Sequence, residues 1–286
     1  MSSASARSLV TLTLLGSLAL VACSPARVNI AQVDSAHAAK DEVFLDKVCS
    51  GALAAAASAK QVACERRDQL QGKANVMRAS CAELPDLAET LIEKGVYVEH
   101  EAAERAIACG NWAWVFESLV WLPTSRDLLR DLEARKHPVG AELDKYAASH
   151  RGPAFLPAPR VVPKNGEAQR GGFARWLVDQ RTKHCASISE AALGATPFAR
   201  EVAMHYVAEV RCKEGQRLAL EALADPGLIR VDACEWLGAL GDATTLEKVK
   251  AVGEGDSYTS RDKSGVLGFP VRSTCMDAAT RIRLRK

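Results

Sequence analysis

Hydrophobic residues in the C-terminal part of the chain recur at the three-to-four-residue spacing of amphipathic helices. Residues 216–253 hold two such stripes, and an Asp-Pro-Gly sequence at 225–227 breaks the chain between them. The spacing therefore predicts two helices folded back on each other as one antiparallel hairpin. The stripes consist of Leu218, Ala219, Ala222 and Leu223, and then of Ala233, Trp236, Leu237 and Leu240.

The second stripe of this hairpin recurs on both sides of it. Each copy begins with an arginine, at Arg200, Arg230 and Arg272, and the apolar positions stay in register. A Gly-, Asp- and Ser-rich insertion at residues 254–268 lengthens the last step. Such repetition is typical of stacked hairpins, because each one must bury apolar surface against its neighbours. The pattern leaves open whether the arginines pair with acidic groups of adjacent units, cap carbonyls or are solvated.

Three features give the hairpin a family likeness. Asp-Pro separates its helices, an alanine lies inside the second helix, and Leu-Gly-x-Leu-Gly-Asp ends it at residues 237–242. With these features it resembles a HEAT-type repeat, in the short form of the PBS-lyase type, over residues 186–285. The resemblance implies an all-α fold, an α-solenoid of stacked antiparallel helical hairpins. The N-terminal half shows generic α-hairpin character only.

Helical stripes also occupy the first half of the chain. They predict an N-terminal α-helical region at residues 41–150, with an unbroken stripe from Leu84 to Ile92. Trp112, Trp114 and Trp121 suggest either ligand stacking or core packing, and we favour core packing because two of them lie on or near the buried stripe. Trp114 is the one expected to be exposed.

A Pro- and Gly-rich linker is predicted at residues 151–172, between this region and a HEAT-like repeat region at 173–286. It has no helical stripe, so it is expected to be a long loop. Its apolar residues suit packing across the surface of the helices rather than free solution. These are Phe155, Leu156, Val161 and Val162.

The N-terminus has the pattern of an exported lipoprotein. Arg7 precedes an apolar run that is too short to span a bilayer, and Leu-Val-Ala-Cys at 20–23 resembles a bacterial lipobox. The resemblance implies a signal peptide at residues 1–22 and a lipid on Cys23. Ser24, in place of Asp, favours the outer membrane, facing the periplasm. The alternative is an ordinary signal peptide with a chance cysteine. Residues 23–40 lack apolar periodicity and are expected to form a flexible tether.

Eight cysteines remain after Cys23, and an even count on an exported chain favours disulfides over free thiols. Cys81 and Cys109 are predicted to pair because they lie at the open end of one hairpin. Register in the repeats predicts Cys185–Cys212 and Cys234–Cys275. Cys49 and Cys64 pair by elimination only.

Composition narrows the function further. The chain has 37 Lys and Arg against 35 Asp and Glu, and this near balance argues against a nucleic-acid partner. No Cys/His cluster has zinc spacing, so neither a metal nor another cofactor is expected. No catalytic motif is visible, and we expect no enzyme activity. The histidines are scattered, at His37, His100, His137, His150, His184 and His205.

These observations favour a lipid-anchored scaffold or adaptor of the bacterial cell envelope that binds another, unknown protein. The motivation is the repeat together with the lipobox, since stacked repeats expose long surfaces suited to that role. The alternative is a lyase-like enzyme or small-molecule binder built on the same helices. A third reading is a purely structural envelope protein.

Overall fold

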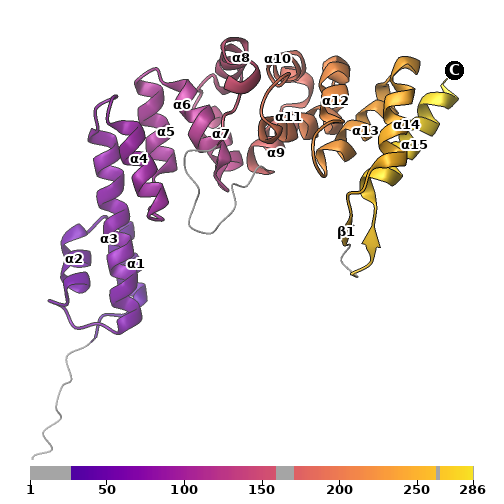
Figure 1. Cartoon of the computed structure of the whole chain (residues 1–286). Helices are drawn as coiled ribbons and strands as arrows, with labels where there is room; N and C mark the ends of the chain where they lie inside the picture. The colour runs from indigo at the N-terminus through magenta and orange to yellow at the C-terminus, as the bar shows by residue number, and fades with distance from the viewer. Residues whose placement is uncertain (1–26, 159–170, 262–264, 286) are drawn as a thin grey trace, which may run out of the picture. The chain divides into compact units, whose positions relative to one another are not determined.

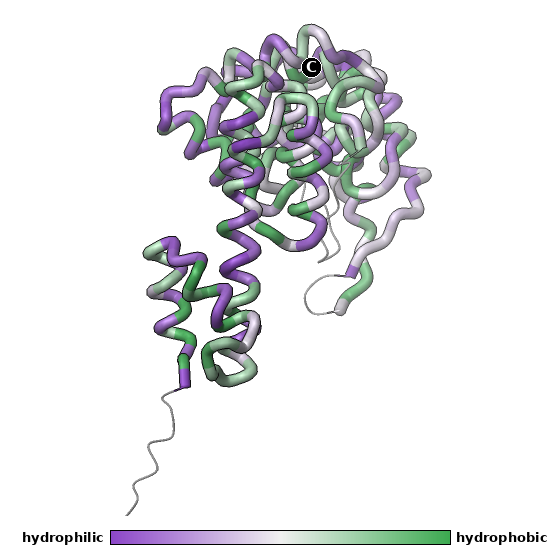
Figure 2. Tube along the Cα trace, turned by 90° about the vertical axis from the view of Figure 1, so that its left-hand side faces the viewer, coloured by the Kyte–Doolittle hydropathy of each residue, from purple (hydrophilic) through white to green (hydrophobic). Residues whose placement is uncertain are grey.

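The computed structural model describes residues 27–158, 171–261 and 265–285. These residues form fifteen α-helices, several short 3-10 turns and one hairpin of two short strands, so the predicted all-α class is confirmed (Figure 1). The chain divides into two compact units, Met1–Arg67 and Asp68–Lys286. The tube in Figure 2, coloured by hydropathy, shows hydrophobic and hydrophilic residues interspersed along the helical chain, as amphipathic helices require.

The first unit contains α1 (Ile30–Ala38), α2 (Glu42–Ser50) and the beginning of α3 (Ala57–Arg78). The prediction of a flexible tether is therefore wrong for the residues of α1. Asn29 and Gln32 form a capping box at its start, and Val33 and Ala36 are its buried residues. Two buried positions are too few to produce a visible stripe, which is why the sequence pattern did not indicate this helix.

The second unit continues with α3 and adds twelve α-helices, which follow one another along the chain in Figure 1. Most connections between them are short; the longer ones lie between α8 and α9 and between α14 and α15, and the latter carries the strand pair β1 (Ser260–Arg261) and β2 (Leu267–Gly268). The helices are α4 (Leu84–Glu93), α5 (Glu99–Ala108), α6 (Trp112–Ser118), α7 (Ser125–Ala134), α8 (Val139–Ser149), α9 (Gly171–Asp179), α10 (Cys185–Ala191), α11 (Pro197–Val210), α12 (Gln216–Ala222), α13 (Ile229–Leu240), α14 (Leu246–Gly255) and α15 (Pro270–Leu284).

Helices of the second unit pack against the next helix but one as well as against sequence neighbours. The helices α5, α7, α9, α11, α13 and α15 each contact the next member of this set, which we call the odd row. The even-numbered helices α6, α8, α10 and α12 contact one another in the same way. The surface of the odd row therefore brings together residues that lie about one repeat apart in the sequence.

The linker predicted at 151–172 does not separate two domains. Contacts of α7 with α9 and of α8 with α10 cross it, and one hydrophobic core extends from Val76 to Ile282. Phe155 and Leu156 are fully buried, as expected, whereas Val161 and Val162 lie outside the described residues. Proline and glycine indicate where a helix cannot form, but they do not indicate where the core ends.

Trp114 is buried, with 3% of its surface exposed, so its expected exposure is wrong. Its indole Nε1 donates a hydrogen bond of 3.0 Å to the carboxylate Oε1 of Glu89 on α4. Ser118 donates to the same oxygen. Glu89 on the neighbouring helix α4 thus supplies the hydrogen-bond acceptor that allows Trp114 and Ser118 to be buried. The hydrophobic stripe of α6 alone contains no information about this acceptor.

Candidate functional site

Four disulfides connect the pairs that the sequence predicted. Their Cα–Cα distances are 4.8 Å for Cys49–Cys64, 5.6 Å for Cys81–Cys109, 5.3 Å for Cys185–Cys212 and 4.9 Å for Cys234–Cys275. All lie within the range that a disulfide requires. Cys23, the predicted lipidation site, lies outside the described residues.

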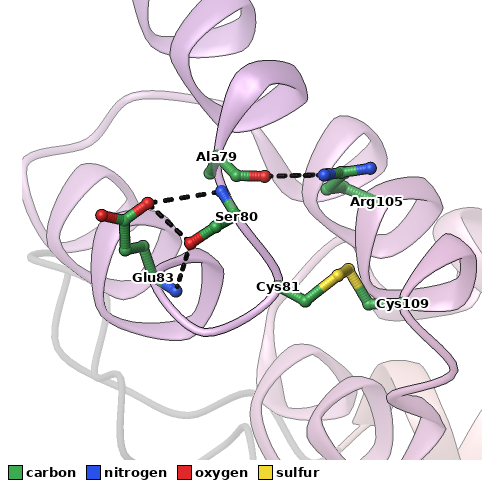
Figure 3. Close-up of a disulfide and its surroundings, with 6 residues drawn as sticks. All are labelled: Ala79, Ser80, Cys81, Glu83, Arg105 and Cys109. Atoms are coloured by element: carbon green, nitrogen blue, oxygen red, sulfur yellow. Dashed lines mark hydrogen bonds between the residues drawn. A yellow bond between two sulfur atoms is a disulfide. The ribbon is translucent and has the colours of Figure 1, made fainter.

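The Cys81–Cys109 bridge closes the open end of the α4–α5 hairpin (Figure 3). Around it, the Ser80 hydroxyl and main-chain N–H both donate to the Glu83 carboxylate just before α4, and these two bonds lower the pKa of Glu83. Arg105 of α5 donates from Nε and Nη2 to the Ala79 carbonyl at the end of α3, at 3.0 and 2.9 Å. The disulfide and the Arg105 hydrogen bonds thus both connect α5 to the segment between α3 and α4.

The Cys234–Cys275 bridge joins two helices of the odd row, α13 and α15. One turn further along α13, Gly238 faces Ala278 so closely that an added Cβ would lie 2.9 Å from the Ala278 Cα and Cβ. The missing side chain of Gly238 therefore permits the close helix approach at which the disulfide forms.

Two of the three repeated arginines pair with buried aspartates, which answers a question that the sequence left open. Arg200 Nε of α11 donates to Asp225 Oδ2, just after α12, at 2.6 Å. In the next repeat, Arg230 Nη1 of α13 lies 2.5 Å from Asp256 Oδ2, just after α14. Both aspartates are at least 95% buried as whole residues. Each pair thus ties a second helix to the hairpin that follows.

The third arginine, Arg272, has different contacts. Arg272 Nε donates to the Asp256 main-chain carbonyl at 3.0 Å, and its guanidinium lies over the Phe269 ring. Arg285, in the basic C-terminal sequence, donates to the carbonyls of Leu237 and Gly241, among others, at the end of α13. A cationic side chain thus hydrogen-bonds the carbonyls at the C-terminus of α13, where positive charge is favourable.

His184 belongs to a structural cluster. Its Nδ1 lies 3.0 Å from Asp144 Oδ1, and Ser187 donates to the same aspartate oxygen. Its Nε2 is buried against Gly140, where an added Cβ would lie 3.1 Å away. Ser187 and His184 therefore bond to the same aspartate oxygen. In a hydrolytic triad the serine would instead donate to the imidazole nitrogen that does not contact the aspartate.

Ion pairs link consecutive helices along the surface of the odd row. His100 of α5 lies 3.7 Å from Asp131 of α7, and Arg126 of α7 bonds to Asp179 of α9. Further along, His205 Nδ1 of α11 lies 3.5 Å from Asp232 Oδ2 of α13. These pairs are partly exposed, so each contributes little stability, about 0–1 kcal/mol.

Two cavities lie along α11 and α13, and the His205–Asp232 pair lines the first of them. The first, of 340 Å³, lies between α9, α11 and the start of α13 and is mainly apolar. Its apolar residues are Ala174, Val202, Leu228 and Val231. The second, of 420 Å³, lies between α11, α13 and α15 and is mainly polar. Its charged residues are Glu209, Arg211, Glu235, Asp277 and Arg281. We call the surface formed by both cavities, including this ion pair, the α11–α13 groove.

Charges in the α11–α13 groove influence one another. The hydrogen bond with Asp232 raises the pKa of His205, and burial opposes this. Burial raises the pKa of Glu235, and the nearby negative charges of Asp232 and Glu209 add to the increase. The polar cavity holds three carboxylates and two guanidinium groups, a small excess of negative charge.

The sequence analysis did not single out the residues of this groove, although the repeat register contains a signal. The offsets that align the three arginines also align His205, Glu235 and Asp277. Each of these ionisable residues lies between buried positions of its helix. Polar residues at one repeat position of a stacked array form a continuous line on one surface.

Within the described residues, no group of three or more His, Cys, Asp or Glu side chains is placed to hold a metal ion. None of the described helices combines the length and hydrophobicity needed to cross a membrane. The chain matches no family model, no curated protein and no solved structure.

Proposed function

We propose that this protein is a lipid-anchored scaffold or adaptor of the bacterial envelope that binds another protein through the α11–α13 groove. In this proposal the second unit is a HEAT-like solenoid of antiparallel hairpins, and Cys23 anchors the chain in the outer membrane, facing the periplasm. The odd-row contacts and the repeated Arg–Asp pairs support the solenoid. The lipobox at residues 20–23 supports the anchor.

The single observation that carries the proposal is the groove itself. It combines an apolar cavity, a polar cavity and the exposed apolar side chain of Leu228, which is 54% accessible. Binding surfaces of proteins commonly combine an apolar centre with a charged rim. Because the helices that form the groove are held by a disulfide and buried ion pairs, the surface is preorganised for a partner.

A small-molecule ligand is the second candidate. The cavities, of 340 and 420 Å³, fall in the range of about 300–1,000 Å³ that is typical of ligand pockets. A lyase-like enzyme would be one version of this candidate, since its substrate would need such a pocket.

Site-specific photocrosslinking in the native envelope tests the proposal. A photoreactive amino acid would replace Leu228 or Glu235 in the groove, and Glu247 on the exposed side of α14 would serve as the control position. We expect one protein to be crosslinked from both groove positions and not from the control. Equal crosslinking from all three positions, or none from the groove, would contradict the proposal. A small molecule retained through purification, with no protein crosslink, would favour the second candidate.

A further inference from the structure

We propose that the α11–α13 groove takes a basic peptide segment of a partner protein, with aliphatic side chains in the apolar cavity and Lys or Arg in the polar one. This inference rests on the proposed protein-binding function and specifies the chemistry of the partner.

The apolar cavity provides the anchor for aliphatic side chains. Ala174, Val202 and Val231 line it from three helices of the odd row, and Leu228 projects beside it. Covering these surfaces removes apolar area from water, which favours association at about 25 cal/mol per Å². The His205–Asp232 pair lines the same cavity and bridges α11 and α13.

The polar cavity determines the sign of the partner's charge. Glu209, Glu235 and Asp277 line it from three different helices, and none of them makes an ion pair within 4.0 Å in the described part of the chain. Arg211 and Arg281 line the same cavity, and Arg281 acts to lower the pKa of Glu235. The pKa of Glu235 nevertheless remains raised, mainly by burial and then by the negative charges of Asp232 and Glu209.

A cationic side chain in this cavity would relieve the repulsion between the carboxylates, whereas an acidic one would increase it. The order along the groove follows from the two cavities, since the apolar one adjoins the start of α13 and the polar one adjoins its end. The segment is therefore expected to have aliphatic residues and basic residues in separate halves.

Fluorescence anisotropy with the purified full chain tests this inference. The probe is a short labelled peptide with leucines in one half and lysines in the other, compared with versions in which Glu replaces Lys or Ser replaces Leu. We expect only the Leu/Lys peptide to bind, with an affinity that falls as salt is added. The triple variant E209Q/E235Q/D277N is expected to weaken binding about tenfold or more, equivalent to about 1.4 kcal/mol.

The matched control is E93Q/E214Q/E247Q, which removes three exposed carboxylates outside the groove and is expected to leave binding unchanged. Circular dichroism confirms that both variants are folded. No binding of the Leu/Lys peptide, or equal binding of its Glu version, would overturn the inference. A crosslinked partner segment without basic residues would overturn it too, while leaving the proposed protein-binding function intact. Failure of all groove crosslinks would instead remove the proposed function.

Discussion

Charged residues of this protein contribute very differently to stability, and the difference depends on whether their ion pairs are buried or exposed. Arg200 and Arg230 pair with aspartates whose side chains are 4% and 1% exposed. Arg217, in contrast, is 74% exposed beside Glu190. A charge left alone in the interior is costly because water cannot solvate it, whereas an exposed one is solvated at once. The repeated arginine is thus a structural residue at two of its three positions.

Replacing Arg230 by Met is expected to destabilise the second unit by about 3–5 kcal/mol, because the buried Asp256 carboxylate loses its counter-charge. The matched control, Arg217→Met, is expected to change stability by less than about 1 kcal/mol. Urea denaturation followed by circular dichroism measures both. The double variant R230M/D256N should recover part of the loss, and a double variant as unstable as R230M would show that charge is not the cause.

His205 is expected to titrate above its ordinary pKa, because the hydrogen bond with Asp232 favours the charged imidazole. Since the folded-state pKa is raised, the stabilisation is complete below the unfolded value of about 6.5 and is lost as the pH rises through the folded value. NMR titration of the imidazole measures this. Asp232→Asn should lower the midpoint, and an unchanged midpoint would contradict the assigned cause.

At the scale of helices, close approach depends on small residues and covalent bonds acting together. Gly238 lets α13 approach α15, and Cys234–Cys275 joins the same two helices one turn away. Cys81–Cys109 and Cys185–Cys212 instead close the ends of single hairpins. The disulfides therefore serve two purposes, since three of them hold sequence neighbours and Cys234–Cys275 holds successive helices of the odd row.

Gly238→Ala is expected to destabilise the protein by about 1–3 kcal/mol, because the new Cβ would overlap Ala278 on α15 and the packed backbone must shift. Thermal and urea unfolding measure this loss. Gly255→Ala is the control, since a Cβ there meets no atom within 4 Å, and it should leave stability unchanged or raise it by up to about 1 kcal/mol. Equal effects of the two variants would show that α13 and α15 are not in close contact in solution.

At the scale of the whole molecule, the proposed anchor and the proposed groove lie at opposite ends of the sequence. Cys23 precedes the first described helix, and the groove is formed by helices after residue 171. This separation in sequence lets membrane attachment and partner binding be tested independently.

Cys23→Ser is expected to release the protein from the membrane fraction, because the thiol that would carry the lipid is removed. Fractionation of the envelope, followed by immunoblotting, measures the distribution. Globomycin should cause the precursor of the unaltered chain to accumulate. Normal membrane retention of Cys23→Ser would remove the anchor from the proposal without affecting the groove.

The sequence by itself determined the all-α class, most helix positions and the pairing of the cysteines. Helical stripes are a local property, because the period of the backbone places their residues on one face whatever lies opposite. The pairing of Cys81 with Cys109 was also predictable from local sequence, because an antiparallel hairpin places the start of its first helix beside the end of its second. Cys49–Cys64 followed only by elimination.

Only the tertiary structure decided which helices and side chains meet. It showed that the core crosses the linker, that α1 is folded, that Glu89 accepts the Trp114 indole, and that Asp225 and Asp256 bind the repeated arginines. It also brought His205, Asp232, Glu235 and Asp277 together in one groove. Each of these facts depends on a partner supplied by another helix, and the periodicity of a single helix contains no information about that partner.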